Sequence, residues 1–216
     1  MVMYDRRVPP DATETKRRLM EAAVDEFARY GLAGARVDRI AEKANANKRS
    51  IYMHFGTKEE LFDKVLADSF LKLAASITFG EDHLVGYASD LYDRLEETPH
   101  IQRLYLWAGL EREQGFEPES AGYRNRLLSI AGAQAAGLVR ADIPPADLMA
   151  MVIAVVISWD AAVSSLKALG PEFGSSSRAD RKAAVVRAVA GLVRPPEDHP
   201  HEHAMTLRAG VPADRS

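Results

Sequence analysis

The stretch ANANKRSIYMHF, residues 44–55, interrupts a region in which both flanks show the apolar spacing of a helix. Asparagine is a poor helix former, because its short polar side chain competes for nearby backbone hydrogen bonds. Asn45 and Asn47 therefore mark either a weak point within one long helix or a break between two short helices. The two alternatives predict different folds.

The break is the better supported alternative, because each asparagine suits a different position in it. Asparagine is one of the few residues besides glycine that tolerate a positive φ angle, so Asn45 can form the turn. Asn47 can then cap the next helix by accepting a hydrogen bond from a backbone N–H two or three residues later. The sequence thus predicts short helices at 37–44 and 48–55.

A longer helix precedes this pair. It is expected to start near Thr13, a suitable N-cap, and to end at the glycine-containing segment YGLAG, residues 30–34. Two short helices joined by a three-residue turn and packed against a longer first helix form the helix-turn-helix arrangement.

The rest of the chain also shows helical periodicity, and no run alternates with period two for long enough to form a strand. Thr57 and Glu60 have the spacing of a capping box, which predicts a fourth helix from there to about Ile77. The predicted fold class is all-α. Further helices are expected at 83–97, 100–113, 119–136, 146–169 and 178–193, with a short loop at 170–177.

Composition fits a folded protein in a reducing compartment. Hydrophobic residues make up 47% and charged residues 27%, as in ordinary globular domains. The chain has no cysteine, which excludes disulfides, thiolate metal sites and cysteine nucleophiles, and a cytoplasmic location is expected. The N-terminus lacks the apolar region of a secretory signal. The longest uncharged apolar run, Leu148–Trp159, is too short to cross a bilayer, so no membrane partner is expected.

Charge is uneven along the chain. Residues 1–60 carry 12 Lys and Arg against 10 Asp and Glu, whereas the whole chain has a net charge of −3. Within the helix at 48–55, Ile51 and Phe55 are expected to point inward, leaving an open face of Lys48, Arg49, Tyr52 and Met53. A cationic and aromatic helix can lie in the DNA major groove. From composition alone, a merely solvated surface helix is an equally good interpretation.

The segment VDRIAEKANANKRSIYMHFGTKEELF, residues 37–62, resembles the DNA-binding head of the TetR family of bacterial repressors. The matching features are Val37, the pair Ile40-Ala41, then Lys48, Tyr52 and Phe55, followed by Thr57-Lys58-Glu59. The match extends over residues 13–66. Two positions depart from the family pattern: Ala35-Arg36 replaces the usual Ser or Thr before the second helix, and Met53 stands where His or Tyr is common.

The resemblance implies roles for residues of the head. Tyr52, His54 and Lys58 would contact backbone phosphates, and Arg36 is a candidate phosphate contact in place of the missing hydroxyl. The residues expected nearest to the bases are Asn47, Lys48, Arg49 and Ser50.

The expected division of the chain follows from these elements. We expect a flexible arm at 1–12, a helix-turn-helix DNA-binding domain at 13–56, an effector-binding and dimerisation domain at 57–194, and a flexible tail at 195–216. The fourth helix, about 57–77, would link the head to the body.

The last two helices are candidates for a dimer surface, because the first is apolar nearly all round and both could join a four-helix bundle with a partner's. The alternative is that both belong to the core of one chain. The candidate dimer residues are Val152, Val156, Val163, Val185, Val189 and Leu192.

The resemblance also implies a small-molecule pocket among the central helices. Aromatic side chains would form its walls, and two arginines are possible partners for an anion, although each residue could equally belong to the core or the surface. The candidates are Tyr87, Tyr92, Tyr105, Trp107, Phe116 and Trp159, with Arg103 and Arg124.

The function expected from these features is that of a dimeric, ligand-responsive transcriptional regulator, a repressor that a small-molecule effector releases from operator DNA. A constitutive DNA-binding protein without an effector is the first alternative, and an α-helical enzyme is the second. No nucleophile elbow, phosphate loop or HExxH pair supports an enzyme, and no cofactor is expected. The motif HPHEH, residues 199–203, alternates histidines in a proline-flanked tail, and no metal site is predicted there.

Overall fold

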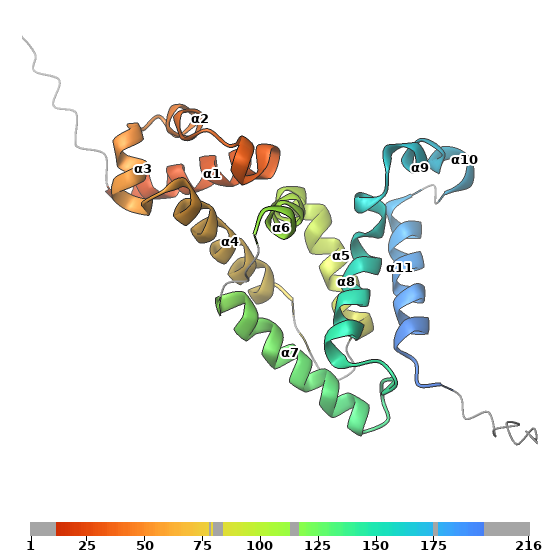
Figure 1. The fold of residues 1–216 in the computed structure, drawn as a ribbon. Helices are drawn as coiled ribbons and strands as arrows, with labels where there is room; N and C mark the ends of the chain where they lie inside the picture. Colours follow the sequence, from red (N-terminus) through yellow and green to blue (C-terminus); the bar gives the residue numbers. More distant parts are fainter. Residues whose placement is uncertain (1–11, 78, 80–83, 113–116, 175–176, 197–216) are drawn as a thin grey trace, which may run out of the picture.

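The computed structural model describes the chain except for residues 1–11, 78, 80–83, 113–116, 175–176 and 197–216. Within the described residues the regular secondary structure is entirely helical, which confirms the predicted fold class (Figure 1). The helices are α1 (Ala12–Gly34), α2 (Val37–Lys43), α3 (Lys48–Phe55), α4 (Lys58–Ala75), α5 (Leu84–Glu97), α6 (Pro99–Glu111), α7 (Glu117–Ala135), α8 (Pro145–Ala161), α9 (Ser164–Ala168), α10 (Gly170–Phe173) and α11 (Arg178–Val193).

Helices α1 to α3 form a head with its own core at one end of the molecule (Figure 1). Phe27 of α1, Ile40 of α2 and Ile51 of α3 are fully buried in it. Phe27 also meets Phe62 of α4 edge to face, with ring centroids 5.0 Å apart. The first turns of α4 therefore belong to the core of the head, and the rest of this helix leads into the body.

The local signals read from the sequence are confirmed at the break and at the start of α4. Asn45 has a φ of 47°, the positive value expected for the turn. Asn47 caps α3, since its side chain accepts a hydrogen bond of 2.9 Å from the Arg49 N–H. Thr57 and Glu60 form the reciprocal capping box of α4, with hydrogen bonds of 2.7 and 3.1 Å.

Helix α1 is interrupted at Gly31, and α6 holds the interruption in place. Gly31 has φ 68° and ψ −176°, which glycine adopts without the steric cost of a Cβ. A Cβ at this position would also lie 2.8 Å from the ring of Trp107. Glu111 accepts hydrogen bonds from the Leu32 N–H (2.5 Å) and the Ala33 N–H (3.0 Å), the donors that the interruption frees. Head and body are thus joined through α6 as well as through α4.

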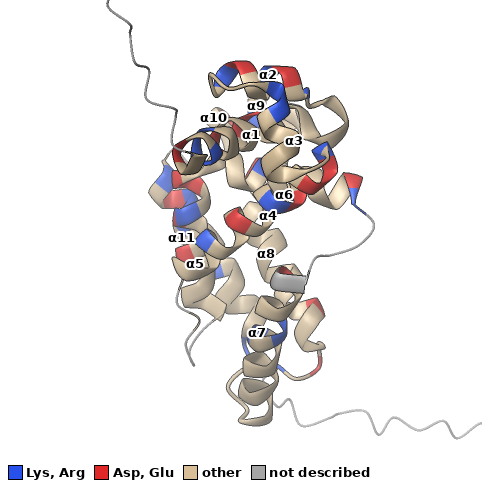
Figure 2. Ribbon diagram, turned by 90° about the vertical axis from the view of Figure 1, so that its left-hand side faces the viewer, with Lys and Arg blue, Asp and Glu red and all other residues tan. Residues whose placement is uncertain are grey.

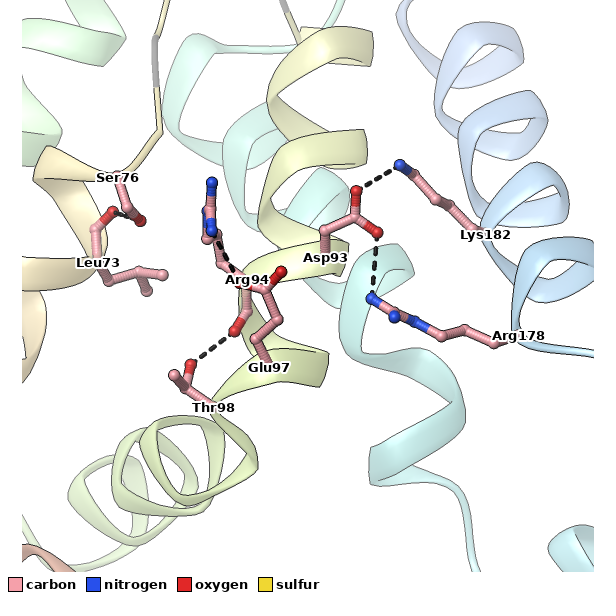
Figure 3. A network of polar contacts seen from close by, with 8 residues as sticks. All are labelled: Leu73, Ser76, Asp93, Arg94, Glu97, Thr98, Arg178 and Lys182. Carbon is pink, nitrogen blue, oxygen red and sulfur yellow. Dashed lines mark hydrogen bonds and ion pairs between the residues drawn. The ribbon is translucent and has the colours of Figure 1, made fainter.

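The body has a second core, in which α5, α8 and α11 lie side by side (Figure 1). Buried aliphatic side chains such as Leu91, Leu148 and Val189 meet there. Outside this core, the Asp93 carboxylate on α5 accepts from Arg178 (3.2 Å) and Lys182 (2.5 Å) of α11, as Figure 3 shows. These pairs connect helices that are far apart in the sequence.

The helix predicted at 146–169 is wrong in its second half. Helix α8 ends at Ala161, because Ala162 and Val163 are extended, with ψ angles of 145° and 151°. The short helices α9 and α10 follow, so residues 170–173, predicted as loop, are helical. Val163 is β-branched and two serines follow it, which weakens helix propensity without the glycine or proline that marks other junctions.

Among the described residues, no helix has the length and apolar character needed to cross a membrane. No group of three or more acidic or histidine side chains in this part of the chain is placed to hold a metal ion. The HPHEH motif, most of the arm and most of the tail lie outside the described residues.

Candidate nucleic-acid interface and internal cavity

The open face of α3 is composed as predicted. Ile51 and Phe55 are buried, whereas Lys48 and Arg49 are exposed. Tyr52 is 50% exposed, which places it on the open face rather than in the packing against α1. Met53 and Ser50 lie on α3 too, the first 71% exposed and the second half-buried. The face offers cationic, aromatic and hydroxyl groups to a partner outside the head.

Lys48 forms an ion pair with Asp38 of α2, with 2.8 Å between Nζ and the carboxylate. The hydrogen bond from Lys48 lowers the pKa of Asp38, and the same bond raises the pKa of Lys48. Figure 2 shows acidic as well as basic residues on the head helices. An anionic ligand that approaches α3 therefore meets the Asp38 carboxylate beside Lys48, which is one of the two cations at the start of α3.

A carboxylate from α1 supports the N-terminus of α2, where the hydroxyl cap is missing. Arg36 occupies the N-cap position and makes no side-chain cap. Instead, Glu26, which is buried, accepts a hydrogen bond of 2.8 Å from the Arg36 N–H and pairs with Arg39 at 2.6 Å. The Arg39 guanidinium in turn lies 4.3 Å from the ring centroid of Tyr30. The Arg36 side chain remains exposed, and the part played by Glu26 was missed in the sequence because it comes from another helix.

The remaining predicted head residues lie around the junction of α3 and α4. Lys58 is the first residue of α4, and its Nζ lies 3.3 Å from the Ala35 carbonyl oxygen at the end of α1. His54 is half-buried, with its ring 6.2 Å from that of Phe55. Asn47 is exposed at the start of α3. The structure thus gathers the predicted DNA-binding residues around α3, the N-terminus of α2 and that of α4.

A cavity of about 250 Å³ lies among the central helices α4 to α8. Apolar and aromatic side chains form most of its wall. Of the predicted effector residues, Tyr87 and Tyr105 line it, and four further polar or aromatic lining residues were not singled out: Phe70, Gln102, Tyr123 and Arg126. The complete lining adds Leu73, Ala74, Ile77, Leu91, Leu95, Leu106, Ile153 and Ile157.

The other predicted effector residues lie elsewhere or outside the described residues. Arg103 donates a hydrogen bond of 2.8 Å to the Ala28 carbonyl oxygen of α1. Trp107 also contacts α1, because its ring packs against Gly31. Trp159 packs against Gly170 and lies 4.7 Å from the Arg181 guanidinium. Arg124 lines a separate, more open hollow on α7. Tyr92 is buried in the body core, and Phe116 is not described.

Four of the predicted dimer residues face the interior of a single chain. Val152, Val156, Val185 and Val189 are buried in the body core, which agrees with the alternative that they stabilise one protomer. Leu192 is half-buried, and Val163 is 70% exposed. Other apolar residues on the outside of this region are exposed as well: Met151, Leu166, Leu169 and Phe173.

A three-helix head with an open basic helix, joined through α4 and α6 to a helical body, is the architecture of helix-turn-helix regulators of transcription. The family model "Bacterial regulatory proteins, tetR family" matches residues 19–65, and the model "Tetracyclin repressor-like, C-terminal domain" matches residues 83–190. The chain belongs to the TetR family of transcriptional regulators. The family consists of regulators and not enzymes, as predicted.

Individual relatives agree with this assignment. The HTH-type transcriptional repressor SCO4008 of Streptomyces coelicolor is 38% identical over 161 residues, which cover 73% of this chain and 83% of the relative. The HTH-type transcriptional regulator RutR of Escherichia coli (strain K12) is 30% identical over 147 residues, covering 63% and 69%. The solved structure of SCO4942 from Streptomyces coelicolor superposes with a TM-score of 0.76 at 32% identity, covering 84% of this chain and 99% of that one.

Proposed function

We propose that this chain is a dimeric transcriptional repressor that a small-molecule effector releases from its operator in the cytoplasm. The proposal rests on the position of α4, which runs from the head to the cavity. Its first residue, Lys58, lies close to the end of α3, and its last turns supply Phe70, Leu73 and Ala74 to the cavity wall. One continuous helix therefore contacts both the candidate DNA interface and the candidate effector site. SCO4008, the relative described above, is itself a repressor.

The head, residues 13–56, is proposed to bind DNA through α3 in the major groove. Arg49 and Lys48 suit guanine edges, and Asn47 and Ser50 are placed at the same end of the helix. Tyr52, His54, Lys58 and Arg36 are proposed to contact phosphates. Lys58 also stands in the first turn of α4, where free backbone N–H groups favour an anion. These contacts would orient the helix, and the base contacts would select the sequence.

The body, residues 57–194, is proposed to hold the effector and to form the dimer. A dimer would read two half-sites, which compensates for the weak binding of a single head. The exposed apolar side chains Val163, Leu166, Leu169 and Phe173 lie on α9, on α10 and in the residues that flank α9, near one end of α8 and α11 (Figure 1). A second copy of the chain packed there would remove this apolar surface from water.

Each ligand, effector or DNA, would change the affinity for the other by shifting the relative position of the two heads of the dimer. Because such coupling is an equilibrium property, the effector must weaken DNA binding by the same factor as DNA weakens effector binding. A rearrangement of the cavity wall would move the end of α4 and of α6, and both helices are attached to the head.

Selection of bound DNA from a random pool tests the proposal directly. We expect a palindromic sequence whose half-sites lie one helical turn of DNA, about 34–36 Å, or a multiple of it apart. Titration of that complex with metabolite mixtures should then identify a compound that weakens binding. Failure to select any sequence contradicts the proposal, and binding that no compound weakens favours a constitutive DNA-binding protein.

A further inference from the structure

The cavity has an apolar wall with a few polar groups. Among the described residues that line it, none is Asp, Glu or Lys. The polar atoms belong to the side chains of Gln102 and Tyr105 on α6, Tyr123 and Arg126 on α7, and Tyr87 on α5. Ligand sites of proteins are commonly built in this way, with a few polar groups that orient a mainly apolar ligand. The hydrogen-bond partners and the charge of each polar group therefore indicate which ligand fits.

Two neighbouring groups on α6 lack hydrogen-bond partners. Gln102 is only 7% exposed, and its side-chain nitrogen Nε2 is buried without an acceptor among the described residues. The hydroxyl of Tyr105, one turn further along α6, is buried and unpartnered in the same part of the chain. Burial raises the pKa of Tyr105 well above its ordinary value, so its hydroxyl keeps the proton at neutral pH. Both groups can donate a hydrogen bond to an acceptor inside the cavity.

Arg126 adds a positive charge that forms no ion pair among the described residues. Its guanidinium lies 5.5 Å from the ring centroid of Tyr87. The comparably half-buried Arg112 and Arg140 pair with Asp63 and Asp142 respectively. A partly buried cation is normally paired, because burial removes the water that stabilises its charge. At the cavity, the missing partner points to an anionic ligand group.

The aromatic side chains define the rest of the ligand. Phe70 lies between two tyrosines, with ring centroids 6.5 Å from Tyr105 and 5.9 Å from Tyr123. Aromatic walls of this kind favour flat apolar ligands, which they contact by stacking or edge to face. The volume of about 250 Å³ lies just below the roughly 300–1,000 Å³ that is usual for ligand sites, so the ligand must be small.

We propose that the effector is a compact, mainly apolar organic anion, such as an aromatic carboxylate, whose charged oxygens accept hydrogen bonds from Gln102, Tyr105 and Arg126. This inference rests on the proposed function and names the chemical class that its effector site takes. Among the described residues that line the cavity, a cationic ligand finds no comparable partner. Glu119 on α7 is an acidic group near Tyr105, and burial raises the pKa of Glu119, which disfavours its charged form.

Direct binding to the full chain in the absence of DNA tests the inference. The probes are three compounds of nearly equal size: naphthoate, the neutral naphthylmethanol and the cationic naphthylmethylammonium. Calorimetry should show that naphthoate binds at least about tenfold more tightly than either of the others, the gain expected from charge-assisted hydrogen bonds. Equal affinities, or a preference for the cation, overturn the inference.

Two variants assign the preference to the named groups. Arg126→Gln should abolish the advantage of naphthoate, whereas Arg94→Gln should retain it, because Arg94 lies on another helix of the cavity wall and pairs with Glu97. Gln102→Leu should weaken naphthoate more than naphthylmethanol, because a carboxylate is a stronger acceptor than a hydroxyl. Its unfolding temperature should not fall, since the lost amide nitrogen has no partner among the described residues. An advantage that survives Arg126→Gln, or a lower unfolding temperature of Gln102→Leu, contradicts the assignment.

The selected operator distinguishes failure of this inference from failure of the proposed function. If DNA binds and a metabolite releases it while naphthoate shows no advantage, the chemical class is wrong and the ligand-responsive repressor stands. If no DNA sequence is selected, the proposed function fails, whatever the three probes show.

Discussion

Asn45 and Asn47 lie two positions apart and perform different tasks. Asn45 supplies the positive φ of the turn, which glycine also adopts, so Asn45→Gly should be nearly neutral or slightly stabilising. Asn47 accepts the Arg49 N–H, so Asn47→Ala should lower the free energy of unfolding by about 1 kcal/mol. Urea denaturation of the two variants measures both effects. A strong loss of stability in Asn45→Gly would show that its side chain, and not only its backbone, supports the turn.

Asp38 stands close to where DNA phosphates are expected, and it holds Lys48. Asp38→Asn should increase DNA affinity, because it removes a repelling charge and frees the lysine. The slope of log affinity against log salt should become steeper by about one. Asp25→Asn is the matched control, since Asp25 pairs with Lys43 rather than with a residue of α3. Equal effects of both substitutions would show that only net charge matters.

The side chain and the backbone N–H of Arg36 have separate roles. Its backbone N–H is satisfied by Glu26, while its side chain is exposed and free of any cap. Arg36→Ala should leave the stability of the head nearly unchanged and make the salt slope of DNA binding shallower by about one. Electrophoretic mobility shift or fluorescence anisotropy at several salt concentrations gives the slope. An unchanged slope removes Arg36 from the interface.

At the scale of elements, α6 stabilises the interrupted end of α1. Glu111 satisfies two backbone donors freed at Gly31, and Glu111→Ala should lower the free energy of unfolding by about 1–2 kcal/mol. Glu97→Ala, which removes only an exposed pair with Arg94, should cost less than about 1 kcal/mol. Thermal or urea denaturation compares the two. Similar losses would mean that water replaces the Glu111 carboxylate without penalty.

Elements with strong local signals were predictable, and others were not. The asparagine break and the Thr57–Glu60 box depend on neighbouring residues, so the sequence displays them. The end of α8 at Ala161 has no glycine or proline to mark it, and the weak helix propensity of Val163 and the two serines is too slight a signal to locate it from the sequence. Glu26 gives no local signal either, because its carboxylate reaches α2 only after α1 and α2 have packed.

At the scale of the whole molecule, the position of a residue depends on which neighbour each face of its helix contacts. Helix α8 is apolar on nearly every side, so its sequence cannot show that Val152 and Val156 face the core of their own chain. Many aromatic residues of the sequence were candidates for the wall of the cavity. Only the packing of five helices brings Tyr87 and Tyr105 to it and directs Trp107 to the head.

The proposed dimer makes a prediction at this scale. Phe173 is 78% exposed at the end of α10, and Phe173→Ser should weaken the dimer at least about tenfold, since a twofold interface counts the change twice. Leu138→Ser, at a position 64% exposed beyond the end of α7, is the control and should leave the dimer unchanged. Sedimentation equilibrium measures both. An unaffected dimer after Phe173→Ser would place the interface elsewhere.

The contact between Trp107 and Gly31 also gives the protein an optical reporter. The chain has two tryptophans, and Trp159 lies beside Gly170 at the start of α10 and Arg181 of α11, away from Gly31. In a Trp159→Phe background, the emission of Trp107 would report the attachment of the head alone. Quenching or a shift of that emission during effector titration would then follow the motion of the head in real time, without a dye and without DNA.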